Sequence, residues 1–268
     1  MLLTPAESGL QLKDLVVRFG GLVAVDTVSL HAPAARLTGL IGPNGAGKTT
    51  TFNAITGLNR PTSGHVRLNG QDISKLPPQA RAQRGLGRTF QRMELFDSLT
   101  VRENVALGRE AGMAGSNPLR FLRCGAAERR QVRTAATEAM ELSGITALAD
   151  RRPADLSTGQ RRLVELARVI ASGFGMLLLD EPSSGLDKAE THRFGETLRT
   201  LVDERGVGIL CVEHDMALVM RVCDYIYVLD FGKPIFNGTA SQVAGSPIVK
   251  SAYLGSEAVE EALAGRSA

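Results

Sequence analysis

The sequence has few cysteines and no long apolar run. Its three cysteines, Cys124, Cys211 and Cys223, are odd in number and contain no Cys-x-x-Cys pair, so reduced thiols are a simpler interpretation than a disulfide framework. Four scattered histidines predict no metal cluster. No apolar stretch approaches the roughly 18 residues of a membrane-spanning helix. The opening MLLTPAESGL also lacks the basic flank and the apolar length of a signal peptide. We therefore expect a soluble protein that acts at a membrane only through partners.

The sequence also has no large excess of positive or negative charge. The formal net charge is +3 over 268 residues, which gives no independent case for nucleic acid as a partner. A hydrophobic content of 43% and a charged content of 22% are ordinary for a globular chain. The length suits one large domain, or one core with an inserted lobe.

Apolar periodicity predicts an α/β organisation. Residues 11–31 resemble two strands joined at Gly20-Gly21, residues 36–58 a strand, a glycine loop and a helix, and residues 64–73 a short hairpin. The continuous apolar runs at 176–180 and 206–215 are typical of strands buried on both faces of a parallel sheet.

The segment from about 92 to 168 has a helical character instead. Its residues 126–145 place four small or apolar side chains on one helix face, with Gly144 as the expected end of that helix, and Asn117-Pro118 suggests the start of another. The four side chains of the face are Val132, Ala136, Ala139 and Met140.

One glycine-rich loop carries the clearest chemistry. It matches the phosphate-binding pattern G-x-x-x-x-G-K-[ST] in full, after a predicted strand and before a predicted helix. Its glycines let backbone N–H groups approach phosphate oxygens, the lysine reaches the β- and γ-phosphates, and the threonine hydroxyl can bind Mg²⁺. The residues of the loop are Gly42, Pro43, Asn44, Gly45, Ala46, Gly47, Lys48 and Thr49.

Two acidic residues end the apolar run at 176–180. Ligands of α/β sheets bind at strand ends, so Asp180 is a candidate Mg²⁺ ligand in the Walker-B role. Glu181 follows it and could polarise an attacking water. Without the phosphate loop, a helix-capping pair before Pro182 would explain these acids equally well.

A second anion site is predicted at LSTGQ, residues 156–160. Small residues open onto a helix there, where backbone N–H groups and the helix dipole favour an anion, yet the site has no lysine.

Taken together, these motifs resemble the ATP-binding subunit of an ABC transporter over about residues 12–254. LSTGQ is similar to the signature LSGGQ of that family, with Thr158 in place of a glycine, and SSGLD (183–187) is similar to its D-loop. The resemblance implies a P-loop ATPase core with an antiparallel β-subdomain and an inserted α-helical subdomain. It also implies ATP and Mg²⁺ as cofactors and two ATPase subunits packed head to tail, so that the signature of one closes over the ATP held by the other.

The resemblance extends to individual positions. It implies that Glu181, His214 and Gln91 take part in catalysis, and that Thr49, Gln91 and Asp180 hold the metal. It further implies nucleotide contacts at Phe19, Thr50, Ser157, Gly159, Gln160 and Asp187. The contacts of the signature residues would be made across the dimer, with the nucleotide of the other subunit. The implied division of the chain is a flexible start at 1–10, an ATPase domain at 11–254 with its helical subdomain at about 92–168, and a tail at 255–268.

The stretch 85–105, with Arg88-Thr89-Phe90-Gln91, resembles ATPase subunits of branched-chain amino acid importers and related amide importers. This implies membrane permease subunits, a second ATPase subunit of the same or a different kind, a separate substrate-binding protein, no nucleic acid, and a peripheral place on the cytoplasmic face of the inner membrane. A lipopolysaccharide-export ATPase is the alternative. ABC ATPases of translation or chromosome maintenance are less favoured, because the chain has a single cassette and no long heptad coiled coil.

Overall fold

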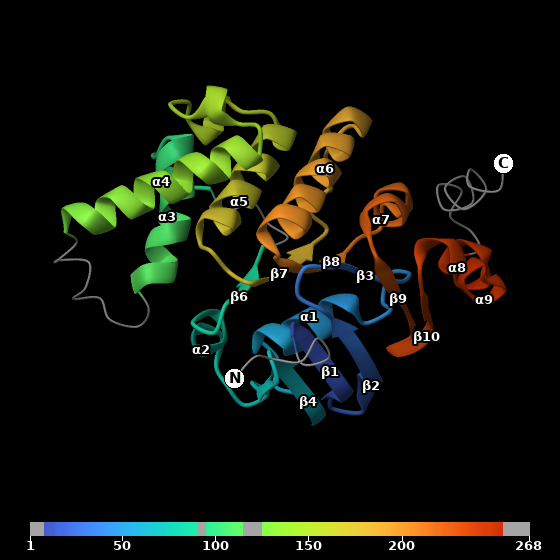
Figure 1. Ribbon diagram of the computed structural model, residues 1–268. Helices are drawn as coiled ribbons and strands as arrows, with labels where there is room; N and C mark the ends of the chain where they lie inside the picture. Colours follow the sequence, from blue (N-terminus) through green and yellow to red (C-terminus); the bar gives the residue numbers. More distant parts are fainter. Residues whose placement is uncertain (1–7, 90–94, 115–124, 254–268) are drawn as a thin grey trace.

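The computed structural model describes residues 8–89, 95–114 and 125–253, and within them the strands form two sheets (Figure 1). The first is an antiparallel sheet in the order β2-β1-β4-β5. Its first two strands pair through a turn at Gly20-Gly21, as the alternation predicts. The bounds are β1 Leu10–Phe19, β2 Leu22–Ala32, β4 Ser63–Leu68 and β5 Gln71–Asp72.

The second sheet has the order β10-β9-β3-β8-β7-β6 and is parallel except for β10 at one edge. Every residue of β3, β7 and β8 is buried, as the continuous apolar runs predict for strands covered on both faces. The bounds are β3 Leu37–Ile41, β6 Leu86–Arg88, β7 Met176–Asp180, β8 Gly208–Val212, β9 Tyr225–Asp230 and β10 Lys233–Gly238.

Two apolar cores sandwich the second sheet. Leu178 of β7 faces a core shared with α1 and the antiparallel sheet, whereas its neighbours Leu177 and Leu179 face a core shared with α5, α6 and α7. This alternation follows from the period of two along a strand. The bounds are α1 Lys48–Thr56, α2 Pro78–Ala82, α5 Thr158–Ala171, α6 Lys188–Arg205, α7 Met216–Val222, α8 Ala240–Gly245 and α9 Pro247–Ala252.

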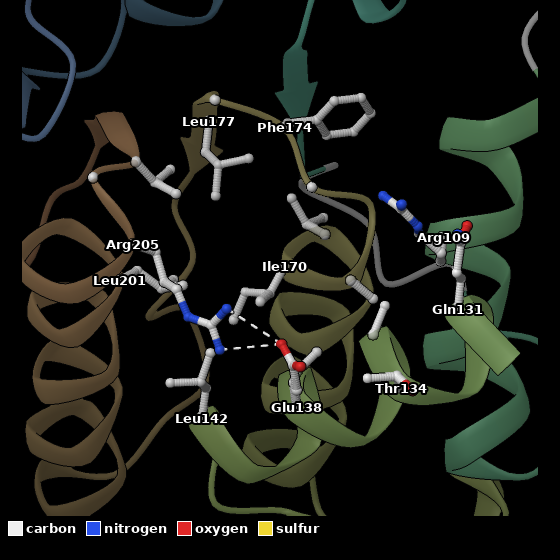
Figure 2. A pocket seen from close by; sticks show the side chains of 18 of the residues that line it. Arg109, Gln131, Thr134, Glu138, Leu142, Ile170, Phe174, Leu177, Leu201 and Arg205 are labelled. Atoms are coloured by element: carbon white, nitrogen blue, oxygen red, sulfur yellow. Dashed lines mark hydrogen bonds and ion pairs between the residues drawn. The ribbon is translucent and has the colours of Figure 1, made fainter.

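A layer of three helices, α3 (Val101–Ala114), α4 (Ala126–Leu142) and α5, packs around its own apolar cluster (Figure 1). The buried residues of α4 are the four that the periodicity predicts, and Gly144 takes a left-handed φ of 65° just after the helix. The expected helix start at Asn117-Pro118 lies outside the described residues. A pocket of about 680 Å³ lies between one face of α4 and the C-terminal ends of α5 and α6. Figure 2 shows Arg205 of α6 reaching into it toward Glu138 of α4, and the two terminal guanidinium nitrogens, Nη1 and Nη2, each lie 3.2 Å from the same carboxylate oxygen.

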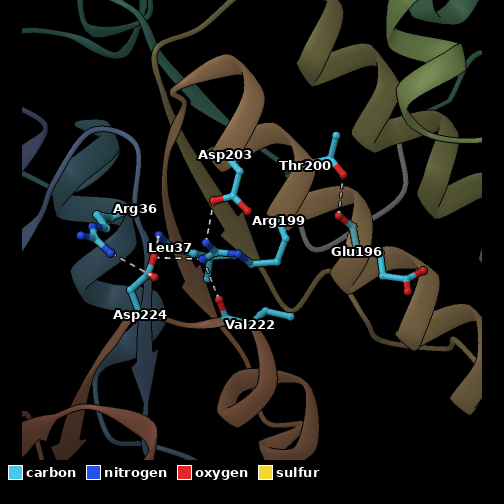
Figure 3. Close-up of polar contacts among 8 residues, drawn as sticks. All are labelled: Arg36, Leu37, Glu196, Arg199, Thr200, Asp203, Val222 and Asp224. Atoms are coloured by element: carbon cyan, nitrogen blue, oxygen red, sulfur yellow. Dashed lines mark hydrogen bonds and ion pairs between the residues drawn. The ribbon is translucent and has the colours of Figure 1, made fainter.

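A polar cluster fixes the start of β3, which leads to the phosphate loop (Figure 3). The Asp224 carboxylate, just before β9, accepts hydrogen bonds from the Leu37 N–H at 2.8 Å and from Arg199 of α6 at 3.0 Å. Arg199 also donates to the Val222 carbonyl at 3.2 Å, at the end of α7. The central strand is therefore tied to α6 and α7 at the end opposite the loop.

Candidate nucleotide site

The glycine-rich loop joins β3 to α1, and its backbone leaves no room for larger residues at two glycines. A Cβ at Gly42 would clash with the Leu229 carbonyl oxygen, and one at Gly47, where φ is 93°, would lie 2.6 Å from the Ala24 carbonyl oxygen. The loop is therefore pressed between β9 and β2. The motif predicts these glycines for phosphate approach, and the structure adds that they also admit the neighbouring strands.

Lys48 lies at the first position of α1 and is buried. Its ammonium group donates to the carbonyl oxygens of Gly42 at 2.6 Å and Pro43 at 2.9 Å, which curls the side chain back over the loop. Burial lowers the pKa of Lys48, while the nearby carboxylates of Glu181 and Asp180 act in the opposite direction. The structure thus brings the predicted lysine and both predicted acids into one electrostatic group.

A pocket of about 430 Å³ opens over this loop. The loop lines one side of it from Asn44 to Thr50, and Glu181 reaches it from the end of β7. Phe19 is not among the described residues that line it, although its cross-strand partner Leu22 is. The lining is completed by Val23, Ala24, Phe231 and Gly232.

The predicted Walker-B aspartate is buried in an ion pair. Asp180 is 2% exposed, and its carboxylate accepts a hydrogen bond from Arg88 of β6 at 2.9 Å. Arg88 also donates to Asn53 at 2.7 Å and Thr56 at 3.2 Å, both on α1. Burial raises the pKa of Asp180, and the hydrogen bond and charge of Arg88 oppose that rise. Arg88 therefore connects the helix of the phosphate loop to the acidic end of β7.

Glu181 occupies a strained turn that is held from β8. Its φ is 47°, a left-handed value that is uncommon for residues other than glycine. Its N–H donates to the Val212 carbonyl at 2.9 Å, and two residues later the Ser183 N–H donates to the buried Glu213 carboxylate at 2.8 Å. Burial raises the pKa of Glu213. The Glu213 carboxylate also accepts from the His214 N–H at 3.2 Å, so one side chain bridges the turn of Glu181 and the loop of His214.

The side chain of His214 lies next to the acids but makes only long contacts with them. Its Nδ1 is 4.0 Å from Glu181 and 3.9 Å from Glu213, and its side chain is largely exposed. Gln91, the third predicted catalytic residue, lies outside the described residues.

The LSTGQ segment forms the N-terminus of α5 and is not among the described residues that line the pocket. Ser157 and Gln160 form a capping box, in which each side chain accepts a hydrogen bond from the other residue's N–H, at 3.2 and 3.1 Å. A Cβ at Gly159 would clash with the Glu190 carboxylate. Glu190 and Asp187 form a second capping box at the start of α6. A Cβ at Gly185 would lie 3.0 Å from the Thr158 methyl group, so the predicted signature and D-loop lie side by side within one chain.

The sequence profile described as "ABC transporter" matches residues 25–184, which is more than half of the chain. The chain belongs to the ABC transporter family.

Curated ABC proteins match it over nearly their whole length. The high-affinity branched-chain amino acid transport ATP-binding protein BraF of Pseudomonas aeruginosa is 40% identical over 249 residues, covering 92% of this chain and 97% of BraF. The lipopolysaccharide export system ATP-binding protein LptB of Haemophilus influenzae is 36% identical over 245 residues, covering 91% of this chain and 96% of LptB. As an ABC ATPase, the chain hydrolyses ATP.

Solved ABC cassettes share the fold. The crystal structure of the ADP conformation of MJ1267, an ATP-binding cassette of an ABC transporter, has a TM-score of 0.81 and 31% identity, covering 92% of this chain and 98% of that one. The predicted fold class is confirmed. None of the described helices of this ABC subunit has the length and apolarity needed to cross a membrane.

Two residues of the ABC site were missed as site residues in the sequence, although signals for both exist. Glu213 directly follows an apolar run of residues, as Asp180 does, and the same pattern predicts a site residue there. Arg88 belongs to a subfamily motif, and a charged residue within a short strand is itself unusual enough to suggest a buried partner.

Proposed function

We propose that this chain is the ATP-hydrolysing subunit of an importer of branched-chain amino acids or related amides. The observation that carries the proposal is its 40% identity to BraF across 97% of that protein. Lipopolysaccharide export is the second candidate and is less favoured, because LptB is less similar and the Arg88-Thr89 motif is typical of the importer group. The partners would be membrane permease subunits, a substrate-binding protein and a second ATPase subunit. The ATPase would sit peripherally on the cytoplasmic face of the membrane.

The pocket over the phosphate loop suits a nucleotide with Mg²⁺. Thr49 lines the pocket, and Asp180 ends β7 directly before the lining residue Glu181; the hydroxyl and carboxylate oxygens of these residues are hard donors, the ligands that Mg²⁺ prefers. Thr49 and Asp180 would hold the ion together with Gln91. When bound, Mg²⁺ neutralises charge on the β- and γ-phosphates.

The protein's own groups divide the remaining work. Lys48, now hydrogen-bonded to two loop carbonyls, would turn to the phosphates when ATP binds. Glu181 would orient and deprotonate the attacking water, since its carboxylate lines the same pocket. His214 lies beside Glu181 and would complete the site as the nucleotide is enclosed.

The signature would act on the nucleotide of a second subunit. Ser157 and Gly159 present the N-terminus of α5, where N–H groups and the helix dipole favour an anion, but they do not line the described pocket of their own chain. A head-to-tail dimer supplies the missing phosphate, with Ser157, Gly159, Gln160 and Asp187 at the interface. ATP would then join the two subunits, and its hydrolysis would separate them.

The catalytic assignment is tested by Glu181→Gln, which keeps the size of the side chain and removes its charge. We expect ATP affinity to persist and turnover to fall by about 10²–10⁴-fold. Glu196→Gln is the matched control, because Glu196 is exposed on α6 away from the pocket. Normal turnover in Glu181→Gln would show that another group activates the water.

The transport assignment is tested by purifying the tagged chain with its membrane partners and reconstituting the complex in vesicles with its binding protein. We expect ATP-dependent uptake of leucine, isoleucine or valine, or of a small amide. An ATPase activity that responds to lipopolysaccharide and to none of these solutes would replace import with export.

A further inference from the structure

The turn between β9 and β10 breaks a local rule of hairpin chemistry. Asp230 pairs with Lys233, so the turn consists of two residues, Phe231 and Gly232, with φ values of 44° and 79°. Two positive φ values define a type I′ turn, which favours Asn-Gly because asparagine tolerates the left-handed conformation. A bulky aromatic residue is strained there, and strain of this kind persists where the surroundings enforce it, often at functional sites.

The surroundings that hold this turn are the walls of the nucleotide pocket. The Gly232 N–H donates to the carbonyl oxygen of Ala46, within the phosphate loop, at 3.1 Å. The Gly232 carbonyl accepts from the Asp26 N–H of β2 at 2.8 Å, and a Cβ on Gly232 would lie 2.8 Å from the Ala24 oxygen. The position of Phe231 is therefore fixed relative to the loop that carries Lys48.

The Phe231 side chain projects from this fixed base into solvent. It is 86% exposed, the most exposed of the large hydrophobic residues that the structure describes, and it lines the same pocket as Lys48. Leu22, 67% exposed, lines the pocket from the tip of the β1–β2 hairpin. The pocket thus has a cationic end at the phosphate loop and an apolar rim built by two hairpin tips.

We infer that Phe231 is a nucleobase-binding residue, whose ring stacks on the base of the nucleotide that the phosphate loop holds. This inference rests on the proposed nucleotide binding. A nucleoside triphosphate has the matching polarity, with an anionic chain for the loop and a flat aromatic base for the rim. Stacking on an aromatic side chain suits a base because every base presents a π-face. Phe19 is expected to stack in this way from the family resemblance, but it is not among the described residues that line the pocket.

The test compares ATP with inorganic tripolyphosphate, which lacks a base, on four proteins: the unaltered chain, Phe231→Asn, Phe231→Ala and Phe231→Tyr. Phe231→Asn should bind ATP about 5- to 100-fold more weakly, as base stacking typically contributes, and tripolyphosphate unchanged. Phe231→Ala should show the same selective loss, and Phe231→Tyr should retain ATP affinity.

The asparagine variant also separates a binding role from a structural one. Asparagine fits the turn better than phenylalanine, so its melting temperature without nucleotide should rise by about 2–6 °C while ATP affinity falls. If Phe231 had only a structural role, Phe231→Asn would have a lower melting temperature and a lower affinity for both ATP and tripolyphosphate. That result would overturn the inference.

A spectroscopic readout is available because the chain contains no tryptophan. Phe231→Trp should show ATP-dependent fluorescence change that tripolyphosphate does not produce, whereas Ile248→Trp, on exposed α9, should show none. Failure of the unaltered chain to bind either ligand would refute nucleotide binding itself. If Phe231→Asn binds ATP and tripolyphosphate as the unaltered chain does, the role of Phe231 is refuted while nucleotide binding stands.

Discussion

Replacing Arg88 by methionine should be among the most destabilising changes in the phosphate-site region. The substitution keeps most of the apolar stem but removes hydrogen bonds to Asn53, Thr56 and Asp180. It also leaves the Asp180 carboxylate, 2% exposed, without its cationic partner. Removing one member of a buried ion pair costs about 3–5 kcal/mol, a large part of a typical unfolding free energy of about 5–15 kcal/mol. The melting temperature should fall by about 6–20 °C.

The loss of unfolding free energy in Arg88→Met should depend on pH, and the direction follows from the pKa of Asp180. Burial already raises the pKa of Asp180, and Arg88 opposes that rise, so the variant raises the pKa further. The folded variant then holds a proton that the unfolded chain releases, and its unfolding free energy falls as the pH increases through the raised pKa. Relative to the unaltered protein, Arg88→Met should recover stability as the pH is lowered from 7 toward the ordinary aspartate pKa of about 4.

Denaturant unfolding of Arg88→Met, Asp180→Asn and the double variant measures this coupling directly. The double variant should be more stable than the sum of the two single effects predicts, because Asp180→Asn removes the stranded charge. Arg84→Met serves as the control, since Arg84 is exposed and its guanidinium donates to the Ala80 carbonyl one turn earlier rather than to a buried carboxylate. A cost below about 1 kcal/mol for Arg88→Met, or strict additivity in the double variant, would refute the reasoning.

Three further predictions concern the nucleotide site. Lys48→Ala should lose ATP affinity as well as turnover, measured by direct nucleotide binding; unchanged affinity would remove Lys48 from the phosphate site. Mixing Lys48→Ala with Ser157→Arg should partly restore ATPase activity if sites are shared between subunits, and verified mixed dimers without activity would exclude sharing. Glu213→Leu should lower kcat more than it raises KM, because the Ser183 and His214 N–H groups lose their acceptor and no longer hold the turn of Glu181. Glu213→Gln, which keeps an acceptor oxygen, should retain most of the activity. Steady-state kinetics in which both variants lose only ATP affinity would contradict this positioning role.

Local patterns were sufficient to predict much of this fold. The buried face of α4, from Val132 to Met140, follows from helical spacing, and the buried strands β7 and β8 follow from unbroken apolar runs. The phosphate loop is equally local, because its chemistry lies in consecutive residues. Each of these features depends on neighbours within one element.

Features that depend on distant contacts could not be predicted in the same way. Arg88 meets Asp180 across 92 positions of the chain, and Ser183 meets Glu213 across 30. Phe231 belongs to the pocket only because the β9–β10 turn bonds to Ala46, which no spacing rule reveals. Phe19 lies at the end of β1, as its position in the sequence predicts, but its cross-strand partner Leu22 is the residue of this hairpin tip that lines the pocket among the described residues.

The absence of a side chain at Gly159 lets the Glu190 carboxylate lie against the first turn of α5. The same glutamate caps α6, so its carboxylate lies between the first turns of the two helices. With 14 residues, α5 is about 21 Å long, so a tilt of about 5° at the signature end would carry its far end by about 2 Å. That far end, at Val169–Ala171, borders the pocket between α4 and α6, where there is open space to receive the displacement. The half-exposed Arg205–Glu138 pair spans this pocket from α6 to α4, so its attraction weakens as ions are added, whereas the apolar packing of α5 against α3 and α4 does not depend on salt in this way.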